Sequence, residues 1–177
     1  WVPSNLDSAV FGTEIADYWF PVTQGGDIAF LYGVVKVLIA EGWIDQAWIA
    51  AHTEGFVELR RQVEAHGFAT LEKAAGLDRA TMREFAELLH GARNAVLVWS
   101  MGITQHPWGA DGVQMILNLA LLRGWIGRDK CGVMPIRGHS AVQGGAEMGA
   151  YSTALPGSKS VTPENARALS GQYGFPV

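Results

Sequence analysis

An arginine and a histidine stand two positions apart in a stretch that is almost free of charge. Arg137 and His139 flank Gly138, and two further glycines follow at Gly144 and Gly145. An arginine in apolar surroundings needs an anionic partner, and a nearby histidine can carry a proton. The pair could therefore orient an anionic substrate and move a proton. Alternatively, Arg137 could be a structural bridge between two domains, with His139 a hydrogen-bonded neighbour.

A polar loop after the apolar run that ends at Trp99 is a second candidate site. Gly102 would let the backbone approach a ligand, and Thr104, Gln105 and His106 offer hydrogen-bonding groups. In open α/β sheets, ligands collect at the carboxyl ends of strands. The alternative is an ordinary connection between a strand and a helix.

The turn Gln24-Gly25-Gly26-Asp27 is the third candidate, because two glycines beside a helix start can hold an anion or the edge of a base. Asp27 could accept two hydrogen bonds from a guanine edge, or it could simply cap the helix. The segment has neither the G-x-G-x-x-G pattern nor a Walker pattern.

Alternating elements must position these residues. Apolar and aromatic residues predict a strand at 16–22 and a buried parallel strand at 94–99. Apolar residues at helical spacing, with aspartate or threonine caps and closing glycines, predict helices after Asp27, at 45–51, 57–65 and 70–75, after Asp78, at 113–121 and after Thr162. This order indicates an α/β architecture with a parallel sheet.

Composition excludes several classes of protein. The 177 residues carry a net charge of −4 without a run of five like charges, so nucleic acid is not an expected partner. The single cysteine, Cys131, excludes an internal disulfide and a four-cysteine cluster, and no metal ligand set is expected in this chain. The longest apolar run, 28–40, contains Lys36 and is too short for membrane insertion, and no signal peptide is visible, so we expect a cytoplasmic location.

The chain has the character of a piece of a larger protein. It starts at Trp1 and ends at Val177 without a closing helix or polar tail, and its last forty residues are glycine-rich and nearly uncharged. We therefore expect exposed apolar surface around 131–160, to be covered by the remaining domains of the parent polypeptide.

Several segments together resemble the molybdopterin oxidoreductases, in particular their formate dehydrogenase alpha-subunit-like branch. Those segments are 101–106 (MGITQH), 118–128 (NLALLRGWIGR) and 132–149 (GVMPIRGHSAVQGGAEMG), with the earlier 13–17, 25–29 and 53–56 (TEGF). They cover nearly the whole chain in the family's order and spacing.

The resemblance implies a molybdenum or tungsten ion held between two molybdopterin guanine dinucleotides. It also implies a [4Fe–4S] cluster elsewhere in the parent and two related three-layer α/β domains. On this basis residues 1–138 are part of a dinucleotide-binding domain, and the glycine-rich residues 139–177 begin a segment that crosses toward the second α/β domain.

The resemblance also assigns roles to individual residues. Gly25, Gly26 and Asp27 would contact the nucleotide, and Met101, Gly102 and Gln105 the pterin and nearby groups. Arg137 matches the arginine that faces the metal in formate dehydrogenases and orients a small anionic substrate. His139 stands where glutamine is common, so the substrate need not be formate.

The family's cluster cysteines, its metal-ligating residue and its C-terminal cap have no counterpart in this chain. The chain alone is therefore not expected to be catalytic, and the redox partner stays undetermined. The alternative is a non-catalytic structural or interaction module descended from the family. A nicotinamide-dependent dehydrogenase is disfavoured by the missing G-x-G-x-x-G pattern.

Overall fold

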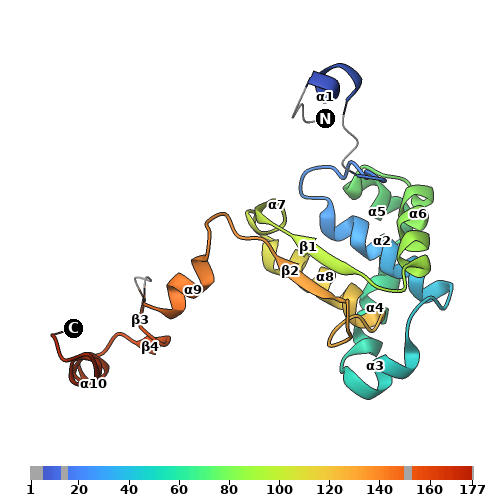
Figure 1. The fold of residues 1–177 in the computed structure, drawn as a ribbon. Coiled ribbons are helices and arrows are strands. Elements are labelled where there is room, and N and C mark those ends of the chain that lie inside the picture. Colours follow the sequence, from blue (N-terminus) through green and yellow to red (C-terminus); the bar gives the residue numbers. More distant parts are fainter. Residues whose placement is uncertain (1–5, 13–15, 150–152, 177) are drawn as a thin grey trace. The chain divides into compact units, whose positions relative to one another are not determined.

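Helix α2, Asp27–Ala40, is the centre around which most of the chain packs (Figure 1). The computed structural model describes residues 6–12, 16–149 and 153–176. The chain divides into unit 1, residues 1–98 with 102–134, and unit 2, residues 99–101 with 135–177.

Helix α2 is apolar nearly all round, which is the pattern of a buried helix. Val34, Val35 and Leu38 are completely buried, because α2 is surrounded by helices that approach it from several sides. These are α4 (Phe56–Ala65), α5 (Phe68–Ala75), α6 (Arg79–Gly91) and α8 (Gly109–Leu122). Where α2 meets α6, a Cβ at Gly33 would overlap the Met82 side chain, so the glycine permits the close packing.

Most predicted helix ends are confirmed. Asp45 caps α3 (Gln46–His52) by accepting a hydrogen bond from the Trp48 N–H at 2.9 Å. Asp78 caps α6 in the same way through the Thr81 N–H at 2.8 Å. Gly76 ends α5 in the left-handed conformation. These ends form as predicted because caps are local interactions.

Two sequence predictions around α2 are wrong. Residues 16–22 form no strand, because a strand needs a hydrogen-bonded neighbour and this segment instead packs Phe20 against Phe30 and Phe85. Asp27 is not the cap of α2 either. The N-cap is Gly26, which gives no side-chain hydrogen bond, and Asp27 is the first helical residue.

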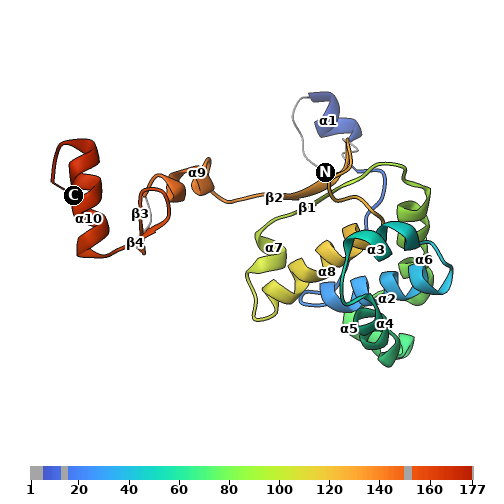
Figure 2. The same ribbon diagram turned by 90° about the horizontal axis from the view of Figure 1, so that it is seen from below.

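The predicted strand after α6 forms as β1, Val96–Trp99, and pairs with β2, Gly132–Pro135, which the sequence did not predict. Hydrogen bonds from Gly132 N to Ala95 O and from Ile136 N to Trp99 O advance in the same direction along both strands, so the pair is parallel. Helices α2 and α8 lie on one face of this sheet (Figure 2). The prediction of a buried strand is wrong, since Val96 is 51% and Val98 48% exposed and the two residues that alternate with them are only half-buried.

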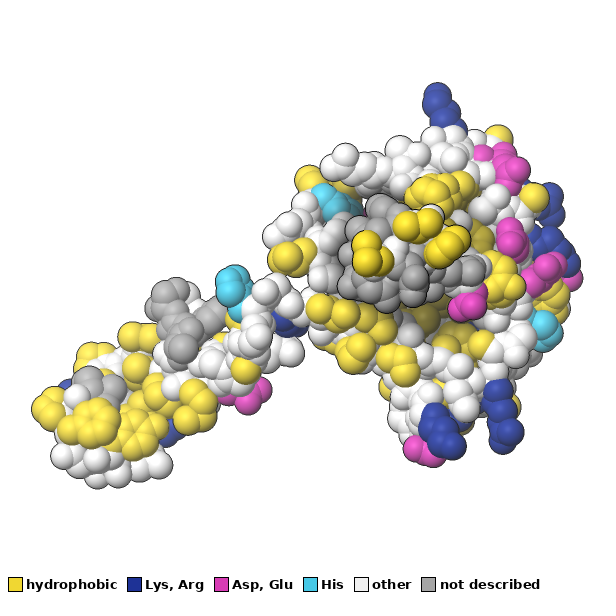
Figure 3. All heavy atoms as spheres, turned by 45° about the horizontal axis from the view of Figure 1, so that its top comes forward, with side chains coloured by type: hydrophobic (Ala, Val, Ile, Leu, Met, Phe, Trp, Pro, Cys, Tyr) yellow, Lys and Arg dark blue, Asp and Glu magenta, His cyan; other side chains and the backbone are white. Residues whose placement is uncertain are grey.

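Unit 2 contains short elements with little core. They are α9 (Val142–Glu147), the antiparallel pair β3 (Ala154–Leu155) and β4 (Lys159–Ser160), and α10 (Pro163–Tyr173), which Thr162 caps as predicted. Apolar side chains are visible over the surface of this unit in Figure 3. The predicted exposed apolar surface within 131–160 is confirmed for four side chains: Met134, Ile136, Val142 and Met148.

The short helix α1, Leu6–Phe11, precedes these elements. None of the described helices is long and apolar enough to cross a membrane.

Candidate functional site

The glycine turn before α2 is anchored on the end of α5. The Thr23 N–H donates to Ala75 O, and the Gly26 N–H donates back to Thr23 O. A Cβ at Gly26 would lie 2.5 Å from Ala74 O, so this glycine is needed for packing against α5. Gly25 has a φ of +78° and no neighbour within 4 Å of an added Cβ. The turn is therefore closed on the Gly26 side and open on the Gly25 side.

Asp27 is half-buried at the start of α2, and no hydrogen bond or ion pair to its carboxylate is found in the described part of the chain. The carboxylate therefore keeps its acceptor capacity for a group outside the chain.

The second candidate segment forms a single helical turn, α7, Met101–Thr104. A Cβ at Gly102 would meet nothing within 4 Å, so the backbone is accessible from outside. After the turn, the Nε2 atom of His106 is buried without a hydrogen-bond partner among the described residues. The chain then packs tightly, because Gly109 lies directly against the Thr104 backbone.

Asp27 and Ile103 line the same cavity, which has a volume of about 240 Å³. The remaining lining is apolar and comes from α2, α6, β1, α8 and the irregular segment before α2: Val22, Phe30, Leu31, Phe85, Val96, Leu97, Val98, Ile116 and Leu119. Asp27 is thus the one charged side chain in this lining. The structure brings Asp27 and Ile103 to one cavity although they are far apart in sequence, whereas the other predicted residues of these two segments do not line it.

Arg137 and His139 lie in unit 2. They follow Ile136, whose N–H donates to Trp99 O at the end of β1. Both side chains are exposed, and within the described residues neither has a hydrogen bond or ion pair. A Cβ at Gly138 would lie 3.2 Å from the Met101 Sδ atom, so Met101 and the Arg137–His139 segment are neighbours within unit 2. The Ser100 hydroxyl supports this region by donating to Ile136 O at 3.2 Å.

The predicted site residues therefore form two groups. Gly25, Gly26, Asp27, Gly102 and Gln105 belong to unit 1, whereas Met101, Arg137 and His139 belong to unit 2. No cluster of three or more metal-ligating side chains occurs among the described residues.

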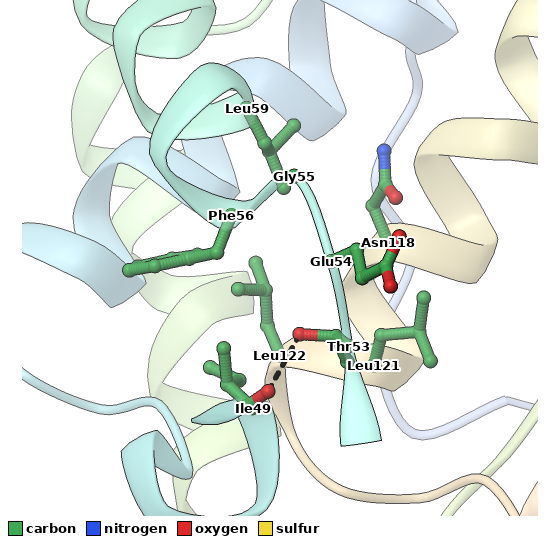
Figure 4. A pocket seen from close by; sticks show the side chains of 9 residues that line it. All are labelled: Ile49, Thr53, Glu54, Gly55, Phe56, Leu59, Asn118, Leu121 and Leu122. Atoms are coloured by element: carbon green, nitrogen blue, oxygen red, sulfur yellow. Dashed lines mark hydrogen bonds between the residues drawn. The ribbon is translucent and has the colours of Figure 1, made fainter. Parts of the chain in front are cut away.

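The Thr53-Glu54-Gly55-Phe56 segment lines a different and much smaller cavity of about 50 Å³ (Figure 4). The Thr53 hydroxyl donates to Ile49 O at 2.8 Å, and Leu121 and Leu122 of α8 supply an apolar wall. Gly55 takes a φ of +76° where the chain enters α4. This segment therefore connects α3 to α4 and faces α8 across the cavity.

Comparisons with known proteins define the class of protein. The family model for "Molybdopterin oxidoreductase" matches residues 5–173. The chain therefore belongs to the molybdopterin oxidoreductase family, as the sequence predicted.

Among its relatives are proteins named as formate dehydrogenases. The chain is 35% identical to formate dehydrogenase H of Escherichia coli (strain K12) over 173 residues, which are 97% of this chain and 24% of that protein. It is 34% identical to the putative formate dehydrogenase YrhE of Bacillus subtilis, over 93% of this chain and 17% of that protein. It is 33% identical to the F420-dependent formate dehydrogenase subunit alpha of Methanocaldococcus jannaschii, over 82% of this chain and 22% of that protein. The chain thus spans a quarter or less of the length of these relatives.

The fold is also found in a solved structure. Acetylene hydratase from Pelobacter acetylenicus superposes with a TM-score of 0.62 at 22% identity, covering 66% of this chain and 16% of that one. This likeness concerns the fold: a mixed α/β arrangement with a small parallel sheet.

Proposed function

We propose that this chain is the part of a molybdenum or tungsten bis(molybdopterin guanine dinucleotide) oxidoreductase that binds the cofactor's nucleotide and orients a small anionic substrate. Membership of the family and the relatives named formate dehydrogenases support the class of reaction. In this proposal residues 1–138 are part of a three-layer dinucleotide-binding domain. Residues 139–177 lead into a second α/β domain, and any [4Fe–4S] cluster lies elsewhere in the parent.

The cavity shared by Asp27 and Ile103 carries the nucleotide part of the proposal. Its residues fit the edge of a guanine, because a carboxylate with free acceptors can receive two N–H groups and the apolar walls suit a flat ring. Gly25 leaves the turn open beside this carboxylate, and Gly102 leaves the α7 backbone accessible. Met101 and Gln105 would contact the pterin and its neighbouring groups.

Arg137 and His139 would act on the substrate. The Arg137 guanidinium is exposed and without an ion pair in the described residues, so it is available to bind a carboxylate in a two-pronged geometry. His139 would donate a hydrogen bond to the same anion or hold a proton released from it. The metal ion supplies the two-electron redox chemistry when the cofactor is bound. The metal ligand is not among the residues assigned here, so the chain by itself would not turn over substrate.

Asp27 gives a test that does not depend on turnover. In the full-length protein, we expect about one molybdenum or tungsten and two guanosine nucleotides per chain after acid hydrolysis. Asp27→Asn removes the charged acceptor with little change in shape and should weaken nucleotide retention by about tenfold or more. Asp111→Asn, at an exposed position on α8, is the matched control and should retain the wild-type content.

Neither metal nor nucleotide in a host that makes the cofactor would favour the non-catalytic module instead. A wild-type nucleotide content in Asp27→Asn would leave the cofactor class intact and remove Asp27 from the site.

A further inference from the structure

A third pocket lies in unit 1 where α6 and α8 end, and it shares no residue with the Asp27 cavity. Its volume is about 280 Å³. Four of its lining side chains are basic, namely His90, Arg93, Arg123 and Arg128, and one is acidic, Asp45. Three of these side chains are arginines, although the chain as a whole has a net charge of −4.

Two of the three guanidinium groups are held in place by uncharged acceptors. Arg123 donates through Nη1 to Trp43 O at 2.7 Å and through Nη2 to His90 O at 3.2 Å. Arg128 donates to Arg93 O and, through Nε, to the Cys131 Sγ atom at 3.3 Å. These contacts fix the positions of the charges without neutralising them.

The positive charge of the pocket is not balanced within the described part of the chain. The ion pairs found there use Arg60, Arg61 and Arg83, and none uses an arginine of the pocket. Asp45 is engaged in capping α3, with its Oδ1 atom accepting from Trp48 N. The pocket thus has more positive than negative charge, and its one carboxylate already has a structural task.

The arrangement disfavours the charged form of Arg123 in particular. Burial lowers the pKa of its guanidinium, and the neighbouring Arg128 charge lowers that pKa further, against an opposing effect of Asp45. The Nε atom of Arg123 is also buried without a hydrogen-bond partner among the described residues. Because arginine stays protonated, an anion in the pocket would relieve the repulsion.

We propose that this pocket is a binding site for a phosphate-type oxyanion with two negative charges, separate from the cofactor site. Guanidinium groups at fixed positions suit the several oxygens of such an anion, whereas a single carboxylate would leave part of the charge unmatched. Arg93 has an exposed side chain for which no bond is found in the described residues, so it is able to close on the anion. The anion is either free inorganic phosphate or the phosphate group of a larger molecule.

Calorimetric titration of the full-length holoenzyme tests the proposal, with inorganic phosphate as the probe and chloride at the same ionic strength as the comparison. We expect saturable binding of one phosphate per chain. Arg93→Gln should weaken that binding by about fivefold to tenfold, since it removes one charged donor. Arg93 is the residue to change because its side chain donates no hydrogen bond to a backbone carbonyl in the described residues, whereas that of Arg123 donates two.

Arg60→Gln is the matched control. It removes the same charge from an exposed position on α4 and should leave phosphate affinity unchanged.

A second titration with phenyl phosphate distinguishes the two sources of the anion. Tighter binding of phenyl phosphate than of inorganic phosphate indicates that the natural ligand is a phosphate group on a larger molecule. The proposal is overturned if the wild type shows no saturable phosphate binding. That result is also the one expected if an acidic side chain of the full-length protein already occupies the pocket. Equal affinity in Arg93→Gln and the wild type would overturn it as well. Neither result bears on the proposed redox function, because no residue of this pocket lines the Asp27 cavity.

Discussion

Unit 1 and unit 2 use their apolar residues in opposite ways. In unit 1, helix α2 is enclosed by four other helices, and almost all buried apolar side chains of the described residues belong to this unit. In unit 2, Leu169 of α10 is the one apolar side chain of the described residues that is buried, while Met148 is 75% exposed. Unit 1 thus has a core of its own, whereas most large apolar side chains of unit 2 in the described residues are exposed.

The proposed chemistry follows the same division. The nucleotide-binding residues lie on the well-packed unit, where a helix start and a short helical turn hold them. The proposed substrate-binding residues, Arg137 and His139, lie on the unit with little core. Substitutions in the two units should therefore have different effects.

The largest effect is expected at Arg137, which should matter for turnover and not for cofactor retention. In the full-length protein, Arg137→Ala should lower kcat/KM by about 10²–10³-fold, because it removes a charge aimed at the substrate anion. Metal and nucleotide contents should stay at wild-type values. Arg167→Ala, an exposed arginine of α10 in the same unit, should leave kcat/KM unchanged. A normal kcat/KM in Arg137→Ala would contradict the assignment.

Two valines compare the cores of the units directly. Val34→Ala should lower the free energy of unfolding of the 177-residue chain by about 2 kcal/mol, because it empties a completely buried position in α2. Val161→Ala, at an exposed position of unit 2, should change it by less than about 0.5 kcal/mol. Urea unfolding followed by circular dichroism measures both. Equal losses would show that unit 2 shares the core of unit 1.

Two glycines compare packing at the backbone level. Gly26→Ala should destabilise the chain by about 1–3 kcal/mol, because the new Cβ would meet the backbone of α5 at 2.5 Å. Gly144→Ala, within α9 and with no atom near an added Cβ, should be neutral or slightly stabilising. Thermal melting of the two variants gives the comparison, and a stable Gly26→Ala would mean that the turn moves away from α5.

The smallest effect concerns the helix caps and depends on pH. Hydrogen bonds from Thr81 hold the pKa of Asp78 below its ordinary value of 3.8, so the carboxylate stabilises the folded state at neutral pH. That contribution is present above pH 3.8 and disappears as the pH falls through the lowered pKa. The cap of α10 in unit 2 is the uncharged Thr162, which contributes independently of pH.

Unfolding midpoints at pH 7 and pH 2.5 test this difference. Asp78→Ala should be destabilised at pH 7, and its deficit relative to the wild type should shrink at pH 2.5. Thr162→Ala should show the same small deficit at both values. A deficit of Asp78→Ala that does not change with pH would exclude the charged cap.

The parts of the fold that sequence predicted well are those governed by near neighbours. The apolar spacing of α2, the caps Asp45 and Asp78 and the stop at Gly76 involve residues within about one helical turn, so their pattern is visible in the sequence. The motif residues also predicted the family, which the comparisons confirm.

Contacts between distant segments account for the errors. Residues 16–22 have strand-forming side chains but no strand beside them, whereas β2 is four residues long, includes a glycine and a proline, and forms because β1 offers an edge. The sequence also could not show that Asp27 lies inside α2 and not at its N-cap, since aspartate is favoured both at the cap and in the first turn.

The sequence by itself determined the family, most of the helices and which residue types could bind an anion. Only the tertiary structure decided that Asp27 and Ile103 line one cavity, that Met101 lies beside Gly138, and that three arginines line another pocket. The physical reason is range. Helix formation and capping depend on residues within about four positions of each other. A cavity or a cluster of like charges depends on how helices from distant parts of the chain pack together.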